Sequence, residues 1–233
     1  MDTTTERPQV TGFWRAVAAI VWKDLTVELR NREVISGMLV FSLLVVLIFN
    51  FALDLDRNAQ ENLIAGVLWV TFVFAATLGI NRTFAAEQDR NSLDGLLLAP
   101  VDRIVLYFGK LFSLLIFVLV VEIIIIPVFS VLYNVNLMNP LLLVVVLLGT
   151  LGYVVVGTLL AAMAVHTRAR EVMLPILLFP VTLPVLLASV QASEAILSGL
   201  AWGRVAGPFN LVAAYDITFL AIAYMTFDYL VEE

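Results

Sequence analysis

The stretch NRTFAAEQDRNSLDGLLLAPVDR, Asn81–Arg103, decides the fold because it is the longest polar interval between two apolar runs of membrane-spanning length. Within it, Leu93, Leu96 and Leu97 are spaced i, i+3, i+4, which predicts one apolar stripe on a short helix. Pro100 ends that helix, since its ring clashes with a continuing helix and its nitrogen carries no proton. The pattern predicts that the chain leaves the bilayer, turns at residues 89–91, lays a short amphipathic helix on the membrane surface and re-enters the bilayer.

Polar residues surround this predicted helix. Asn91 or Ser92 is suited to cap its first turn. Its charged flank consists of Glu87, Asp89, Arg90 and Asp94. Two interpretations follow from the local pattern: the helix docks a soluble partner, or it only tethers two spans.

The composition indicates an integral membrane protein. Hydrophobic residues make up 62% of the 233 residues and charged residues 14%, whereas soluble domains have about 45–50% and about 25%. The net charge of −6 gives no indication of nucleic-acid binding, and the absence of cysteine excludes disulfides and thiolate metal ligands. The polar start of the chain predicts no cleaved signal peptide.

The sequence predicts an all-α membrane domain with six transmembrane helices, because a single apolar run can cross lipid only as a helix. Each run approaches the ~20 residues that a span requires. The predicted spans are 35–53, 63–80, 104–133, 141–165, 172–190 and 211–231, in one permease domain covering residues 1–233.

Residues 11–33 precede the first span and predict an amphipathic helix at the membrane interface. Its expected apolar face comprises Trp14, Val17, Ala18, Val21 and Leu25. This helix anchors the N-terminus, or it also packs against a cytosolic partner.

The basic residues predict the orientation. Eleven of the 13 Lys and Arg residues fall on the side of the N-terminus and of Asn81–Arg103, leaving Arg57 and Arg204 on the other side. Cytoplasmic loops carry the excess of basic residues. Both termini and the loop 81–103 are therefore expected in the cytoplasm. On the outer side, the interval 191–210 suits a short re-entrant or interfacial helix, or a plain surface loop.

Acidic residues inside the spans are candidate functional residues, because charge in the bilayer core is costly. Glu122 lines a pathway or pairs across helices, or it is protonated and hydrogen-bonded within the bundle. Asp216 and Asp228 lie near opposite ends of the sixth run and are expected to be hydrated. The fifth run carries Pro175, Pro180 and Pro184, which predict a moving or unwound element, or a kinked packing helix.

No catalytic constellation is evident, and the chain is not expected to be an enzyme. His166 is the only histidine and is expected to be a solvated loop residue, so neither a metal site nor a haem ligand is predicted. Gly109 and Lys110 resemble the end of a phosphate loop, but Ile104 replaces its first glycine and Leu111 its Ser/Thr. ATP binding by that motif is excluded.

The order of these elements resembles the permease subunit of a type-2 ABC exporter, and particular motifs narrow the resemblance to the CcmB family of cytochrome c maturation permeases, also called haem exporter protein B. The motifs that carry it are Phe13-Trp14-Arg15, Trp22-Lys23-Asp24-Leu25, residues 28–33 (ELRNRE), residues 66–70 (GVLWV), Arg82-Thr83-Phe84, residues 87–90 (EQDR), residues 92–100 (SLDGLLLAP) and Gly109-Lys110.

The resemblance implies a bacterial inner-membrane protein that couples ATP hydrolysis by a partner ATPase, CcmA, to haem delivery or to release of the haem-loaded chaperone CcmE, together with CcmC. It implies ATP and haem bound by partners and none by this chain. The alternatives are a type-2 ABC permease for a lipid or polysaccharide, and a non-transport membrane scaffold. On this resemblance the ATPase-coupling residues are Glu87, Asp89, Arg90, Ser92, Leu93, Gly95, Leu96 and Leu97, with Glu122 and Asp216 as possible intramembrane functional residues.

Overall fold

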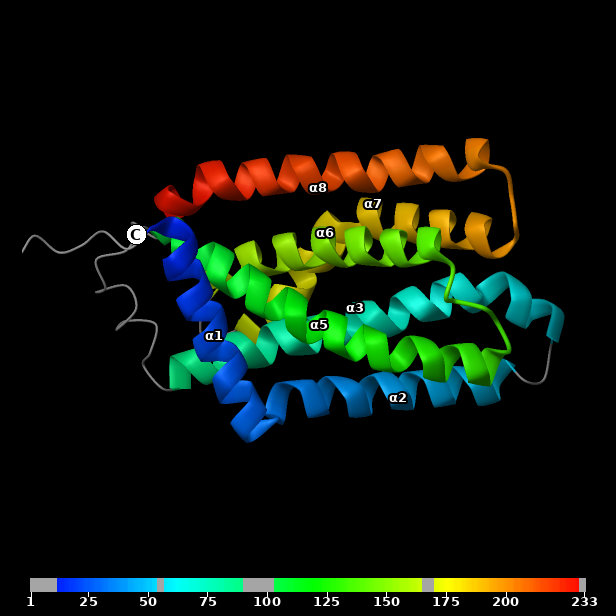
Figure 1. Cartoon of the computed structure of the whole chain (residues 1–233), viewed down its shortest axis with the longest axis horizontal. Coiled ribbons are helices and arrows are strands. Elements are labelled where there is room, and N and C mark those ends of the chain that lie inside the picture. Colours follow the sequence, from blue (N-terminus) through cyan, green and yellow to red (C-terminus); the bar gives the residue numbers. More distant parts are fainter. Residues whose placement is uncertain (1–11, 54–56, 90–102, 165–169, 231–233) are drawn as a thin grey trace, which may run out of the picture.

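The computed structural model describes residues 12–53, 57–89, 103–164 and 170–230, and in these ranges the chain is helical with no strand. The helices run side by side as a bundle, with α1 lying across one end (Figure 1). Their bounds are α1 Phe13–Asn31, α2 Glu33–Leu53, α3 Arg57–Asp89, α5 Arg103–Tyr133, α6 Pro140–Ala164, α7 Arg170–Leu197 and α8 Trp202–Leu230.

Six of these helices are long and apolar enough to cross a membrane, which confirms the predicted fold class. Their apolar segments are Glu33–Ala52, Leu63–Phe84, Ile104–Tyr133, Pro140–Ala164, Val172–Leu197 and Trp202–Thr226. The spans agree with those predicted except at the ends of α3, α7 and α8. The α3 helix continues to Asp89, so the first part of the polar interval extends the second span.

Neither alternative predicted for residues 191–210, a separate short helix or a surface loop, describes this interval. The α7 helix continues to Leu197 and α8 begins at Trp202, so only a short turn separates the two helices. Gly199 lies in that turn with a φ of +66°, a left-handed conformation that costs glycine little. Pro208 is inside α8, since membrane helices tolerate Gly and Pro when neighbouring groups satisfy the backbone.

The proline-rich fifth span is also a continuous helix. Pro175, Pro180 and Pro184 all lie inside α7, so the predicted unwound element is not present. The Tyr215 hydroxyl on α8 donates a hydrogen bond of 3.0 Å to the carbonyl of Val181, within this stretch. This hydrogen bond ties α8 to α7 between Pro180 and Pro184.

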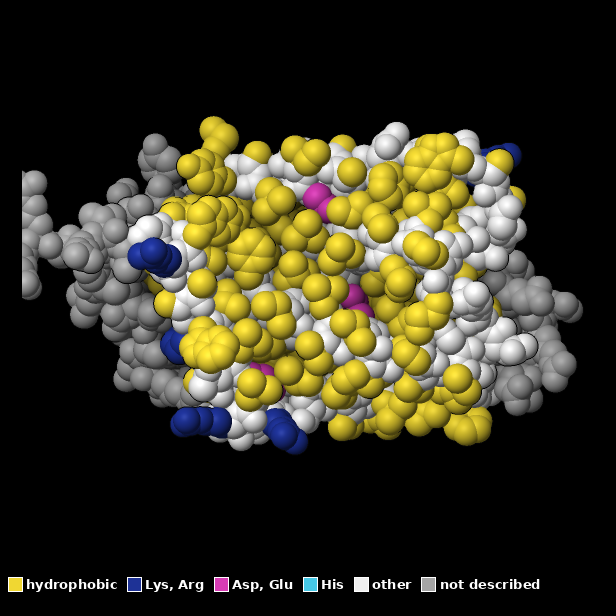
Figure 2. All heavy atoms as spheres, viewed as in Figure 1, with side chains coloured by type: hydrophobic (Ala, Val, Ile, Leu, Met, Phe, Trp, Pro, Cys, Tyr) yellow, Lys and Arg dark blue, Asp and Glu magenta, His cyan; other side chains and the backbone are white. Residues whose placement is uncertain are grey.

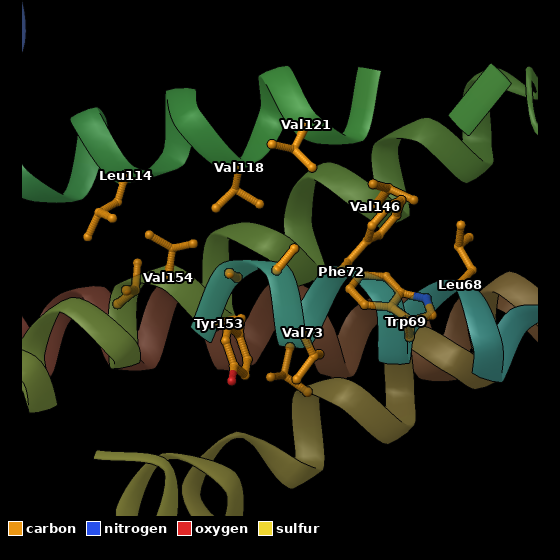
Figure 3. Close-up of a cluster of buried hydrophobic side chains, with 14 of the residues drawn as sticks. Leu68, Trp69, Phe72, Val73, Leu114, Val118, Val121, Val146, Tyr153 and Val154 are labelled. Carbon is orange, nitrogen blue, oxygen red and sulfur yellow. The ribbon is translucent and has the colours of Figure 1, made fainter. Parts of the chain in front are cut away.

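The centre of the bundle is formed by α3 and α6, whose apolar segments are 72% and 67% buried, against 22% for those of α2 and α8. Figure 3 shows side chains that fill this region, among them Trp69, Phe72 and Val73 of α3 and Tyr153 of α6. Gly149 of α6 permits the close approach, because a Cβ there would collide with the Trp69 ring and the Ser189 hydroxyl. Close backbone approach at small residues is the usual way in which membrane helices pack.

Candidate functional site

The first candidate site is the junction of α1 with α2 and α5. The buried residues of α1 are Val17, Ile20, Asp24 and Glu28, along one side of the helix. The predicted apolar face was therefore rotated from the true one, since Trp14 is 68% exposed and Ala18 is also exposed. The two acids belong to the buried face because each has a specific partner.

Asp24 forms a salt bridge with Lys110 of α5. The Lys110 Nζ lies 2.8 Å from Asp24 Oδ2, and the two side chains are only 7% and 8% exposed. Lys23 approaches the other carboxylate oxygen at 3.2 Å and is 41% exposed. Burying two charges costs several kcal/mol in each case, and a close pair with further hydrogen bonds is what offsets that cost.

Glu28 fastens α1 to the start of α2. Its carboxylate accepts hydrogen bonds from the backbone N–H groups of Ile35 at 2.7 Å and Val34 at 3.3 Å. These N–H groups belong to the first turn of α2. The N–H groups of a first turn have no carbonyl partners within their own helix, and the helix start attracts negative charge. Arg32, with a φ of 51°, makes the sharp turn between the helices.

Close packing adds a third link. A Cβ on Gly109 of α5 would lie 2.7 Å from the Ile20 Cγ2 and 2.8 Å from the Ile20 Cβ. Only glycine allows the two helices to approach this closely. The salt bridge, the Glu28 cap and this contact together hold α1 against both α2 and α5.

This junction was not predicted from the sequence, where Lys110 entered as a basic residue, as part of a failed phosphate loop and as part of the Gly109-Lys110 motif of the family resemblance. The available signal was its position inside the apolar run 104–133, because a basic residue within a span requires a partner. Lys and Arg side chains gather at the end of the bundle where α1 lies (Figure 2). The α1 helix at that end contains Arg15, Lys23 and Arg30, as the predicted clustering of basic residues requires.

The second candidate site is Glu122, near the middle of α5. Its side chain is 2% exposed, and its Oε1 accepts a hydrogen bond of 2.5 Å from the Thr150 hydroxyl of α6. Its Oε2 has no hydrogen-bond partner among the described residues. The geometry therefore matches the bonded, in-bundle interpretation for one oxygen, and leaves the other unsatisfied.

Asp216 differs from its prediction. Because α8 begins at Trp202, Asp216 lies in the middle of the helix, and it is only 3% exposed. The expected hydration near a membrane surface is therefore wrong. Its Oδ1 occupies the space above Gly152 of α6, and neither carboxylate oxygen has a hydrogen-bond partner within the described ranges.

Other predicted residues lie outside what the structure describes. These are Arg90, Ser92, Leu93, Gly95, Leu96, Leu97 and His166, together with the side chains of Glu87, Asp89 and Asp228. The described ends of the helices do place the predicted loop: α3 ends and α5 begins at the end of the bundle where α1 lies (Figure 1). In the described part of the chain, no group of three His, Cys, Asp or Glu residues is arranged to hold a metal.

Known proteins match this chain over most of its length. A sequence profile for the family described as "CcmB protein" matches residues 15–232. A protein of Bradyrhizobium diazoefficiens named "Heme exporter protein B" is 27% identical over 210 residues, covering 89% of this chain and 93% of that protein. Proteins of the same name are 28% identical in Rhodobacter capsulatus, covering 78% and 84%, and 26% identical in Haemophilus influenzae, covering 85% and 96%.

Proposed function

Since this chain belongs to the CcmB family of membrane proteins, we propose that it is the transmembrane permease subunit of an ABC transporter for c-type cytochrome biogenesis. In this proposal a separate ATPase, CcmA, hydrolyses ATP. The permease couples that hydrolysis to haem delivery, or to the release of haem-loaded CcmE, acting together with CcmC. The subunit itself holds neither ATP nor haem.

The observation that carries the proposal is the extent of the family match. It begins in α1 and ends just past α8, so it includes every described helix rather than one generic span. The relatives named "Heme exporter protein B" match over most of their own length as well. A scaffold or an unrelated transporter would have no reason to share the whole arrangement.

We place the end of the bundle that carries α1 on the cytoplasmic face of a bacterial inner membrane, with both termini there. The bias of basic residues supports this orientation. Labelling with a membrane-impermeant thiol reagent tests it, because the chain has no native cysteine. Asn136→Cys should be labelled from outside intact cells and Ser92→Cys should not; the reverse pattern contradicts the orientation.

In this arrangement the segment between α3 and α5 is the part that meets the ATPase. Its leucine stripe would fill a groove on CcmA, and its charged flank would form the rim of the contact. The α1 junction supports a mechanical role for the neighbouring helices, because the buried Asp24–Lys110 pair and the Glu28 cap make α1, α2 and α5 move together. Movement of the docked segment would then reach α1 through α5.

The buried carboxyl groups of Glu122 and Asp216 are proposed as the intramembrane functional residues. Three of their four carboxyl oxygens lack hydrogen-bond partners among the described residues. Unsatisfied buried polar atoms carry a free-energy cost that a purely structural residue has no reason to retain.

Leu96→Asp tests the coupling, with Leu98→Asp as its matched control. Leu96 belongs to the predicted stripe, whereas helical periodicity predicts Leu98 on the opposite side of the same predicted helix. Truncation of an interface anchor typically costs ~2 kcal/mol or more, so Leu96→Asp should lose co-purification with the ATPase at normal abundance, and Leu98→Asp should retain it. Unchanged co-purification of Leu96→Asp at normal abundance would show that this segment is not the docking site.

A further inference from the structure

A crevice opens between α1, α2 and α5, and its volume is about 480 Å³. Its walls are Trp22, Leu25 and Leu29 of α1, Ile35 of α2, and Phe117 and Val120 of α5. Small-molecule sites usually have volumes of ~300–1,000 Å³ and predominantly apolar walls. The crevice thus has the size and lining of a binding site.

The apolar walls of the crevice are open to the outside. Trp22 is 73% exposed and Leu29 is 70% exposed. In a six-span protein such residues face the hydrocarbon and interface of the bilayer, where Trp is favoured at the level of the lipid headgroups. The neighbours that reach this opening in a membrane are acyl chains.

The charge at the rim selects among lipids. Arg30 lines the crevice in the last turn of α1 and is exposed, and no carboxylate within the described ranges forms a salt bridge with it. Glu28 also lines the crevice, but its carboxylate is engaged by the N–H groups of Val34 and Ile35. A guanidinium above an apolar crevice therefore complements a phosphate group attached to an acyl chain.

We propose that this crevice is a binding site for an anionic phospholipid of the leaflet that contains α1. One acyl chain lies between α1, α2 and α5, and the headgroup phosphate pairs with Arg30. The bound lipid fills the gap in the junction that holds α1 to the bundle. This inference stands on the crevice itself and does not depend on what the transporter moves.

Native mass spectrometry of the full chain, purified and then exchanged into mixed phosphatidylglycerol and phosphatidylcholine micelles, tests the site. The wild-type protein should retain one phosphatidylglycerol in preference to phosphatidylcholine. Arg30→Gln should reduce that preference about fivefold, the worth of one basic residue near an anionic surface. Arg15→Gln, an exposed arginine on α1 outside the crevice, is the matched control and should keep the preference.

A second variant tests the apolar part of the site. Val120→Trp fills the crevice and should abolish retention of either lipid, whereas Ile123→Trp, on an exposed position of the same helix, should not. Equal retention of the two lipids by wild-type protein and Arg30→Gln would overturn the assignment, as would unchanged retention by Val120→Trp. Displacement of the lipid by added haemin, lost in Val120→Trp, would also overturn it by making the crevice a haem site.

Discussion

The buried pair between Asp24 and Lys110 makes a quantitative prediction about α1. Both side chains are less than a tenth exposed and their charged atoms are 2.8 Å apart. Removing one member of such a pair costs ~3–5 kcal/mol, because the other charge stays buried without its counter-charge. Asp24→Asn should therefore destabilise the folded protein by about 3 kcal/mol, at the lower end of that range, since asparagine keeps a hydrogen-bonding group.

Substitution of the partner, Lys110→Met, is expected to destabilise the folded protein less than Asp24→Asn. Lys110→Met leaves Asp24 with Lys23, which already lies 3.2 Å away. The double variant Asp24→Asn with Lys110→Met leaves no buried charge without its counter-charge, and that uncompensated charge is the cause of the loss in Asp24→Asn. Stability of the double variant should thus recover much of the loss seen in Asp24→Asn, with a coupling free energy of about 1–3 kcal/mol.

Unfolding of the purified protein by sodium dodecyl sulfate in mixed micelles, followed by tryptophan fluorescence, measures these differences. Two of the four tryptophans, Trp14 and Trp22, lie on α1. Lys23→Gln is the control, because a pair with one half-exposed partner contributes only ~0–1 kcal/mol. Additive losses in the double variant, or an Asp24→Asn midpoint equal to that of Lys23→Gln, would refute the proposed role of the pair.

Three further predictions follow from the packing. Gly109→Val should cost about 1–3 kcal/mol, because the added carbons overlap a β-branched side chain of α1; Gly66→Val, where nothing lies within 4 Å, should be neutral, and equal midpoints for the two variants would contradict this. Trp69→Phe removes the 2.9 Å hydrogen bond to Ser193 and should cost ~0.6 kcal/mol, up to ~1.7, in the same unfolding assay; no change in Trp69→Phe beside a loss in Ser193→Ala would argue against the bond. Asp216→Leu should leave stability unchanged or higher while c-type cytochrome maturation falls; normal maturation would make the residue structural.

The number and type of spans could be predicted from the sequence because hydrophobic length alone sets them. A membrane core demands ~20 apolar residues in a row and satisfies their backbone only as helix. The ends of the helices were harder to predict. The interval 191–210 was not expected to belong to the spans, but lipid-embedded helices tolerate Gly and Pro, and α8 therefore starts nine residues before the predicted span.

That shift in the start of α8 also explains the error at Asp216. A residue about one turn inside a span that begins at 211 would be hydrated, whereas in a helix that begins at 202 it lies mid-span. The contacts of Asp24 and Glu28 could not be predicted from the sequence for a different reason. Asp24 faces the bundle because Lys110, far along the chain, pairs with it, and Glu28 does so because it binds the start of α2. The apolar periodicity of α1 contains no sign of either partner.

Glu122 lies inside α5, in the candidate span Ile104–Tyr133, as its position in the run 104–133 predicted. Its bond to Thr150 was not predictable, because it depends on the register of α5 against α6. The prediction of the coupling residues depends on the sequence motif between α3 and α5. The side chains of these residues lie outside the described part of the chain.

The most direct test of the proposed function is the amount of covalently bound haem in c-type cytochromes, measured by haem staining of denaturing gels. The measurement compares the host organism, a strain lacking this chain, and that strain with the chain restored. The proposal predicts loss of c-type cytochromes in the deletion with normal b-type cytochromes, and recovery on restoring the chain but not its Leu96→Asp variant. Normal levels of covalent haem in the deletion strain would contradict a role in cytochrome c maturation and favour a permease for another substrate.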